Sequence, residues 1–264
     1  MGTGTCTTGA LENEKEMVME KEDYIFGTRA IIEAIRNGQN VEKVLIKKGL
    51  DNELFSELFQ LIKQNSISFQ YVPVEKINQV TRKNHQGLIA LLSAIEFSDV
   101  DMLIPDLFES GKDPLILILD QITDVRNFGA IIRTAECGGV HCIIIPEKGM
   151  ARIGSDAVKT SAGAIYSIPI CKVRSTSTAI RYLKNSGIKI IAATEKSAKV
   201  YTETAMNLPL AIIMGAEDKG ISTSVLQLAD EKIRIPLYGK IESLNVSVAA
   251  GILIYEAAKQ RNQV

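Results

Sequence analysis

The sequence predicts an α/β protein of two domains, the larger built on a parallel sheet. From residue 115 onward, short continuous apolar segments such as LILILD (115–120) alternate with segments of helical length. The same alternation on a smaller scale fills residues 24–96. Between them, residues 97–113 are rich in Asp, Ser, Gly and Pro, as linkers are. We therefore expect a small domain (24–96), a linker with at most one helical turn (97–113) and a larger domain (114–264).

The small domain should contain alternating strands and helices. Residues 1–23, Thr/Gly-rich and then acidic, are predicted to be a disordered extension. Beyond them Ile31, Ile32 and Ile35 mark one face of a helix, and Asn52 begins a second, amphipathic one. After a short apolar entry at 24–27, the periodicity predicts strands at 41–48, 68–74 and 88–97, and helices at 29–38, 52–64 and 74–81.

A polar segment, RKNHQG (82–87), precedes the last strand of this domain. Two cations, two amides and a histidine before a glycine turn could hold a phosphate or an unstacked base. A solvated turn is the alternative interpretation. We predict RNA contacts for Arg82, Lys83, Asn84 and His85.

The larger domain should alternate buried strands with covering helices. Continuous apolar runs are typical of strands that are buried on both faces of a parallel sheet. The expected strands are 115–120, 142–146, 166–171, 189–194, 208–215 and 232–237, with helices at 129–139, 153–161, 177–185, 222–229 and 243–261. The last helix is apolar on nearly every face of its first three turns, so it should be buried on all sides, against the sheet or a second subunit.

Composition removes several classes of function. The net charge of −1 and pI near 6.2 give no global basic field, so RNA would need a local patch. Four cysteines without CxxC spacing and two histidines argue against a metal site. The chain lacks GxGxxG, GxxxxGK[ST] and GxSxG motifs. With no signal peptide or membrane-spanning run, we expect a cytoplasmic protein.

Three polar motifs follow predicted strands at their carboxyl ends, where open α/β sheets bind ligands. In DQITDVRNFGAIIRTAE, Asn127 is the expected cap of a helix that carries Arg133, and Gly129 clears space beside Arg133. In IIMGAEDKGIS, two glycines bracket Glu217. In the third, SLNVS, Ser243 is the expected cap of the last helix and Asn245 lies in its first turn. Each could be a solvated or capping residue instead.

Taken together, NxGxxxRxA, MGAExxGIS and IPLxGxxxSLNVSVAxGIxxYE resemble the three signatures of the SpoU (TrmH) family of RNA ribose 2'-O-methyltransferases, across residues 115–261. Residues 24–96 resemble, more loosely, the ribosomal-protein-like substrate-binding domain of the RlmB branch, which modifies a guanosine in the peptidyl-transferase region of 23S rRNA. The resemblance implies a SPOUT domain with a deep trefoil knot and a homodimer that buries the last helix.

The resemblance also implies S-adenosylmethionine as methyl donor, held mostly by backbone groups of the knot loops. These positions are Thr194, Met214, Gly215, Ile235, Leu237, Ser243, Leu244 and Val246.

The family positions at the reacting centre are Asn127, Arg133, Glu217 and Asn245. Because a guanidinium keeps its proton far above neutral pH, we expect Arg133 to stabilise the developing alkoxide or fix a phosphate rather than act as base. No metal is needed.

We thus expect a guanosine 2'-O-methyltransferase acting on 23S rRNA. The alternatives are a tRNA guanosine 2'-O-methyltransferase and a catalytically silent RNA-binding or ribosome-assembly factor.

Overall fold

A computed structural model describes residues 24–262 of the chain. The chain divides into two compact units, Met1–Leu92 and Ser93–Val264. The extension predicted at residues 1–23 lies outside the described residues.

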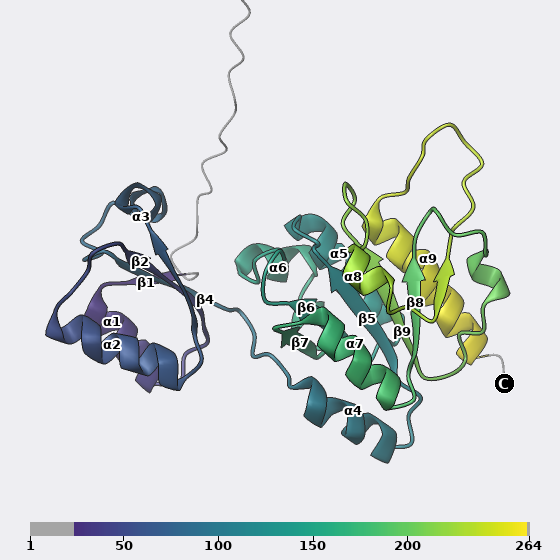
Figure 1. The fold of residues 1–264 in the computed structure, drawn as a ribbon, viewed down its shortest axis with the longest axis horizontal. Coiled ribbons are helices and arrows are strands. Elements are labelled where there is room, and N and C mark those ends of the chain that lie inside the picture. Colours follow the sequence, from purple (N-terminus) through teal and green to yellow (C-terminus); the bar gives the residue numbers. More distant parts are fainter. Residues whose placement is uncertain (1–23, 263–264) are drawn as a thin grey trace, which may run out of the picture. The chain divides into compact units, whose positions relative to one another are not determined.

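The first unit is a four-stranded sheet with helices on both faces (Figure 1). The strand order is β1-β4-β2-β3; β2 and β3 are parallel, and the other pairs are antiparallel. Helices α1 and α2 cover one face of the sheet over Val44 and Ile46, while α3 packs on the other over Leu45. Its elements are β1 (Tyr24–Phe26), α1 (Thr28–Arg36), β2 (Val41–Lys47), α2 (Glu53–Gln64), β3 (Ser68–Val72), α3 (Val74–Val80) and β4 (Leu88–Leu92).

The second unit is a six-stranded, fully parallel sheet in the order β10-β8-β9-β5-β6-β7. This confirms the predicted α/β class. Its strands are β5 (Leu115–Asp120), β6 (Cys142–Pro146), β7 (Ile170–Val173), β8 (Lys189–Ala193), β9 (Leu210–Gly215) and β10 (Glu231–Ile233). Its helices are α4 (Val100–Glu109), α5 (Val125–Cys137), α6 (Ser155–Thr160), α7 (Thr176–Asn185), α8 (Thr223–Leu226) and α9 (Val246–Arg261), with short 3-10 turns at Ala164–Tyr166 and Tyr201–Glu203.

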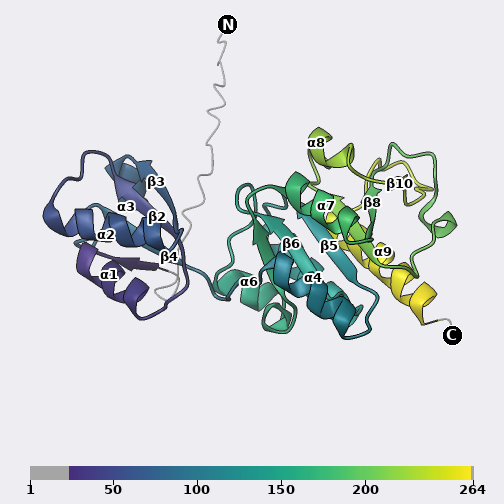
Figure 2. The same cartoon turned by 60° about the horizontal axis from the view of Figure 1, so that its bottom comes forward.

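Two apolar layers enclose this sheet, because successive side chains of each strand point to opposite faces. Leu115, Leu117 and Leu119 pack with α5 and α9 on one face. Ile116 and Ile118 pack with α4, α7 and α8 on the other. Figure 2 shows α4 and α7 together on that second face. All six residues of β5 are buried, as the uninterrupted run LILILD predicts.

The predicted linker is wrong in one respect. Residues 100–109 form the ten-residue helix α4, capped by the Asp99 side chain, which accepts from Asp101 N at 2.9 Å. Ile104 and Leu107 are buried in the core of the second unit. Pro105 and the short apolar run obscured the helix in the sequence, because propensity weighs less than burial of an apolar face.

Two predicted helix caps also differ. Helix α5 begins after Asp124, whose carboxylate accepts from Arg126 N and Asn127 N at 2.9 and 2.8 Å, so Asn127 lies within the first turn. Helix α9 begins after Asn245 instead of Ser243. Strand β10 ends at Ile233, four residues before the predicted end, and its continuation is a loop. Within this chain α9 is not buried on all sides, since Val248 and Tyr255 are about half exposed.

Gly129 allows α5 and α6 to pack in contact. A Cβ at this position would lie 2.0 Å from Thr160 Oγ1 and 2.8 Å from the Thr160 carbonyl carbon. The space beside Gly129 is therefore filled by the end of α6, whose backbone at Thr160 approaches closely.

We predict that Gly129→Ala destabilises the protein by about 2 to 4 kcal/mol, because the added methyl group meets backbone that cannot rotate away. Gly251→Ala is the control, since its Cβ would lie 3.5 Å from Thr134 Cγ2, an ordinary contact. Chemical denaturation of both variants checks this, and equal stability of the two would contradict it.

An electrostatic cluster fixes the edge strand β10. Glu231 accepts from Lys189 Nζ at 2.6 Å, Lys199 Nζ at 2.7 Å and Thr204 Oγ1 at 3.1 Å. The hydrogen bonds from the two lysines lower the pKa of Glu231 from its ordinary value of 4.5 to about 2.

Because the folded pKa of Glu231 is depressed, its contribution is present above pH 4.5 and is lost as the pH falls toward 2. We expect Glu231→Gln to lower the free energy of unfolding at pH 7 by about 1 kcal/mol. The difference from the unsubstituted protein should disappear as the pH falls toward 2. Denaturation curves at pH 7, 4 and 3 test this, and a pH-independent difference would exclude the charge as its cause.

Candidate functional site

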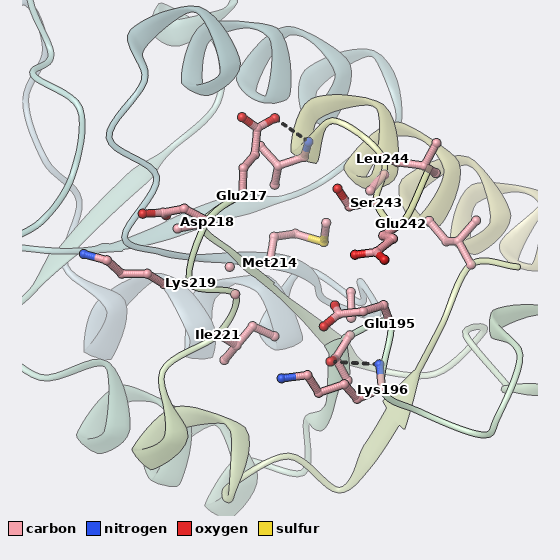
Figure 3. A pocket seen from close by; sticks show the side chains of 18 of the residues that line it. Glu195, Lys196, Met214, Glu217, Asp218, Lys219, Ile221, Glu242, Ser243 and Leu244 are labelled. Atoms are coloured by element: carbon pink, nitrogen blue, oxygen red, sulfur yellow. Dashed lines mark hydrogen bonds between the residues drawn. The ribbon is translucent and has the colours of Figure 1, made fainter. Parts of the chain in front are cut away.

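The carboxyl ends of β8, β9 and β10 surround a cavity of about 380 Å³ (Figure 3). The segment 235–246, between β10 and α9, closes its remaining side. The cavity therefore lies where parallel α/β sheets bind ligands, outside the carboxyl edge. Its volume falls within the range of small-molecule and cofactor sites.

The cavity combines an apolar interior with a charged rim. Met214, Ile233 and Leu253, all buried, form part of its wall. Lining residues with charged side chains are exposed or half-exposed: Glu195, Lys196, Glu217, Asp218, Lys219 and Glu242. Figure 3 shows Met214, Glu195 and Glu242 directed into this space. Such a site suits a ligand with a flat apolar part and cationic or hydroxyl groups.

The loop after β9 is held in a tight, self-contacting turn. Ala216 and Gly220 form an antiparallel bridge, and Gly220 N donates to Ala216 O at 2.8 Å. A Cβ on Gly215 would lie 2.2 Å from the carbonyl carbon of Gly220, so only glycine allows this crossing. The buried carboxylate of Asp120, at the end of β5, accepts from Ser222 N at 2.7 Å and fixes the exit of the loop.

Asn245 connects three segments that are far apart in the sequence. Its Nδ2 donates to Glu217 Oε1 at 2.6 Å and to Asn127 Oδ1 at 2.9 Å. Its Oδ1 accepts from Ser247 N at 2.9 Å as the cap of α9. Glu217 Oε1 also accepts from Val246 N at 3.1 Å, which places a carboxylate at the amino end of α9, where negative charge is favoured.

Three of the four residues predicted at the reacting centre are therefore in direct contact: Asn127, Glu217 and Asn245. Arg133 lies six positions beyond Asn127 on α5, with an exposed side chain. Within residues 24–262, no hydrogen bond or ion pair links Arg133 to the other three.

The eight residues predicted to hold the donor all line the one cavity. Thr194 comes from the end of β8, Met214 and Gly215 from β9, and the remaining five from the segment around the start of α9. We call Asn127, Glu217 and Asn245 the Asn245 cluster. Glu217 also lines the cavity, so this cluster forms part of the cavity wall. Sequence reasoning missed the charged rim residues Glu195, Lys196, Asp218, Lys219 and Glu242. Their position could have identified them, because each lies within or next to a predicted strand end or one of the three motifs.

His85, in the loop predicted to contact RNA, has a structural role. Gly87 N donates to His85 Nδ1 at 2.9 Å, so Nε2 carries the ring proton and donates to Asn78 Oδ1 at 2.9 Å. Both ring nitrogens thus stabilise the loop. Arg82, Lys83 and Asn84 are exposed, and Lys83 Nζ lies 5.9 Å from the centroid of the Phe26 ring. In residues 24–262 no group of three or more His, Cys, Asp and Glu side chains could hold a metal, and no helix is long and apolar enough to span a bilayer.

Comparison with known families gives two matches along the chain. Residues 114–255 match the model of the SpoU rRNA Methylase family. Residues 24–98 match the model described as RNA 2'-O ribose methyltransferase substrate binding.

Whole-length relatives agree. YacO of Bacillus subtilis, named as a TrmH family tRNA/rRNA methyltransferase, is 33% identical over 245 residues, covering 93% of this chain and 98% of YacO. A protein of Staphylococcus saprophyticus with the same family name is 34% identical over 244 residues, covering 92% of this chain and 98% of that protein.

Solved structures share the fold. AviRb of Streptomyces viridochromogenes, a SpoU methyltransferase crystallised with AdoMet, has a TM-score of 0.58 at 22% identity, over 90% of each chain. A TrmH/SpoU tRNA modifying enzyme of A. aeolicus has a TM-score of 0.53 at 32% identity, over 62% of this chain and 85% of that one.

We predict that Asn245→Ala destabilises the protein by about 2 kcal/mol or more, because it removes a helix cap and leaves Glu217 and Asn127 without their shared donor. Asn245→Ser keeps a capping oxygen but cannot donate to both partners, so it should recover only part of the loss. Thermal unfolding of the two variants separates capping from bridging. Full recovery by serine would show that the bridge contributes nothing to stability.

Proposed function

Because the chain belongs to the SpoU rRNA methylase family of RNA methyltransferases, we propose that it transfers a methyl group from S-adenosylmethionine to the ribose 2'-oxygen of a guanosine in 23S rRNA. The observation that carries the proposal is that all eight predicted donor-binding residues line one cavity, whose wall includes Glu217 of the Asn245 cluster. The match of residues 24–98 to a substrate-binding model supports RNA as the methyl acceptor.

The cavity fits S-adenosylmethionine chemically. Its apolar wall at Met214, Ile233 and Leu253 suits an adenine ring. The carboxylates of Glu195 and Glu242 suit the ribose hydroxyls, the ammonium group and the sulfonium. When bound there, the donor would supply an electrophilic methyl group on a positively charged sulfur.

The chain's residues then have to position the acceptor ribose. In-line displacement depends on alignment, which can contribute several kcal/mol to lowering the barrier. We assign Asn245 and Glu217 to orienting the reacting groups, since their side chains are fixed by mutual hydrogen bonds and by the start of α9. The guanidinium of Arg133 would bind the phosphate beside the ribose or stabilise the 2'-alkoxide as it forms. The proton acceptor would be water or a phosphate.

We also propose a homodimer that covers α9. Val248 and Tyr255, about half exposed on this helix, give it an apolar face that a second copy would bury. The trefoil knot and the cytoplasmic location stay predictions.

A tRNA is the second candidate substrate. It is favoured by the A. aeolicus relative, described as a tRNA modifying enzyme, which is 32% identical to this chain. That relative aligns with 62% of this chain and not with its whole length. The separate substrate-binding match at residues 24–98 therefore makes tRNA the second candidate and not the first. A catalytically silent RNA-binding factor is the third; it would bind RNA without using a donor.

The deciding measurement is transfer of labelled methyl from S-adenosylmethionine to total RNA from cells lacking the enzyme, with the modified ribose mapped. We expect a single 2'-O-methylguanosine in 23S rRNA. Label in tRNA would show that the substrate is tRNA and would leave the proposed reaction unchanged. Absence of both methyl transfer and donor binding would contradict the enzyme assignment.

We predict that Arg133→Ala lowers the rate of methyl transfer about 100-fold or more while donor affinity stays within about twofold. Arg181→Ala is the matched control, an exposed arginine on α7, on the opposite face of the sheet. Single-turnover transfer and equilibrium dialysis give the two quantities. Loss of donor binding in Arg133→Ala would indicate a structural role instead.

A further inference from the structure

An aromatic stripe lies at the open edge of the first unit's sheet. Among the described residues, 24–262, strand β3 has one sheet neighbour, β2, so its outer edge is unpaired by this part of the chain. Phe69 and Tyr71, two residues apart on this strand, lie on the same face, and their ring centroids are 5.9 Å apart. Phe59 of α2 continues the stripe, with its ring 5.1 Å from Phe69. We call Phe59, Phe69 and Tyr71 the aromatic stripe.

Phe59 packs partly buried against the core, but folding of the unit does not account for the exposure of Phe69 and Tyr71. Val72 is the one buried residue of β3, whereas Phe69 is 39% and Tyr71 45% exposed. The buried core beside them is completed by Val44 and Ile46 of β2 and by Phe55 of α2. A strand edge with exposed aromatic side chains is a liability for aggregation unless a partner uses it.

The net charge of the first unit is complementary to nucleic acid. Residues 24–92 carry nine lysines and arginines against six acidic residues, a net charge of +3, while the whole chain carries −1. Lys63 Nζ lies 4.6 Å from the centroid of the Phe59 ring. The carboxylate of Glu57, also on α2, is paired with Arg36 at 2.7 Å, which reduces its repulsion of phosphate.

We propose that the aromatic stripe is a stacking platform for unpaired bases of the RNA substrate, with Lys63 beside it contacting the phosphate backbone. The inference rests on the proposed function, since it names the surface by which the first unit holds RNA. Aromatic rings next to cations bind single-stranded segments because every base has a π face, and duplex bases are not available for this contact. This surface is separate from the Arg82 to His85 loop, which precedes β4.

Binding of a labelled stem-loop of 23S rRNA, and of a fully paired RNA duplex of equal length, to the full-length protein tests the platform. We expect Phe69→Ala and Tyr71→Ala each to weaken stem-loop binding by about 5- to 100-fold, with duplex affinity unchanged. Tyr71→Phe keeps the ring and should bind normally. Phe108→Ala, which removes an aromatic side chain of 37% exposure from α4 in the second unit, is the matched control.

The dependence on salt separates stacking from charge. Lys63→Gln should reduce the magnitude of the slope of log affinity against log salt concentration by about 1, because one phosphate contact is lost. The two alanine variants should keep the slope of the unsubstituted protein. In methyl transfer, the alanine variants should raise KM for RNA and leave kcat and donor affinity unchanged. Circular dichroism melting verifies that each variant is folded.

Unchanged stem-loop affinity in a folded Phe69→Ala/Tyr71→Ala double variant would overturn the platform. A change in sedimentation without a change in RNA affinity would overturn it as well, and would make the stripe a protein interface. If the protein binds RNA through the stripe but transfers no methyl group, the platform stands and the proposed reaction fails. If the unsubstituted protein methylates RNA and the double variant has the same KM for RNA, the proposed reaction stands and the platform fails.

Discussion

The hydrogen-bond cluster around Asn245 is the interaction on which the rest of the site depends. One side chain caps α9, donates to Glu217 in the loop after β9, and donates to Asn127 in the first turn of α5. It thereby fixes the start of α9 against two other elements of the sheet edge. Because α9 also packs against α5 through the apolar layer of Leu253 and Ile254, its position is determined at both the polar and the apolar ends. A site built on such fixed elements can hold reacting groups without reorganisation.

The parallel sheet explains why the site lies where it does. Strands β8, β9 and β10 are neighbours, so their carboxyl ends open side by side, and the loops that follow them form a single cavity. Both faces of the sheet are packed mostly with apolar side chains. Polar functional groups are consequently found at the carboxyl edge, where backbone N–H and C=O groups no longer pair with a neighbouring strand. There Gly215 allows one loop segment to contact another.

The two units contribute different kinds of recognition. The second unit provides a deep, partly apolar cavity with acidic rim residues, which suits a small cationic donor. The first unit has a positive net charge, an exposed loop and two exposed aromatic rings, which suit a large, flexible, anionic partner. In the chemistry proposed, the energy gained by binding a large RNA would be used to align one ribose with the methyl group.

The sequence by itself determined the α/β class, nearly all the strands and the family, and it predicted the site residues. Apolar runs and motif spacing are local properties, so they can be read along the chain. Only the tertiary structure decided that Asp124 and Asn245 are the caps, that residues 100–109 pack as a helix, and that Asn245 joins Asn127 to Glu217. The reason is that several neighbouring Asp, Asn and Ser residues have equal capping propensity, and the choice among them falls to the partners that folding brings close. Asn245 has Glu217 and Asn127 as such partners, at 28 and 118 residues of separation, whereas Ser243, two positions earlier, is placed on the cavity wall.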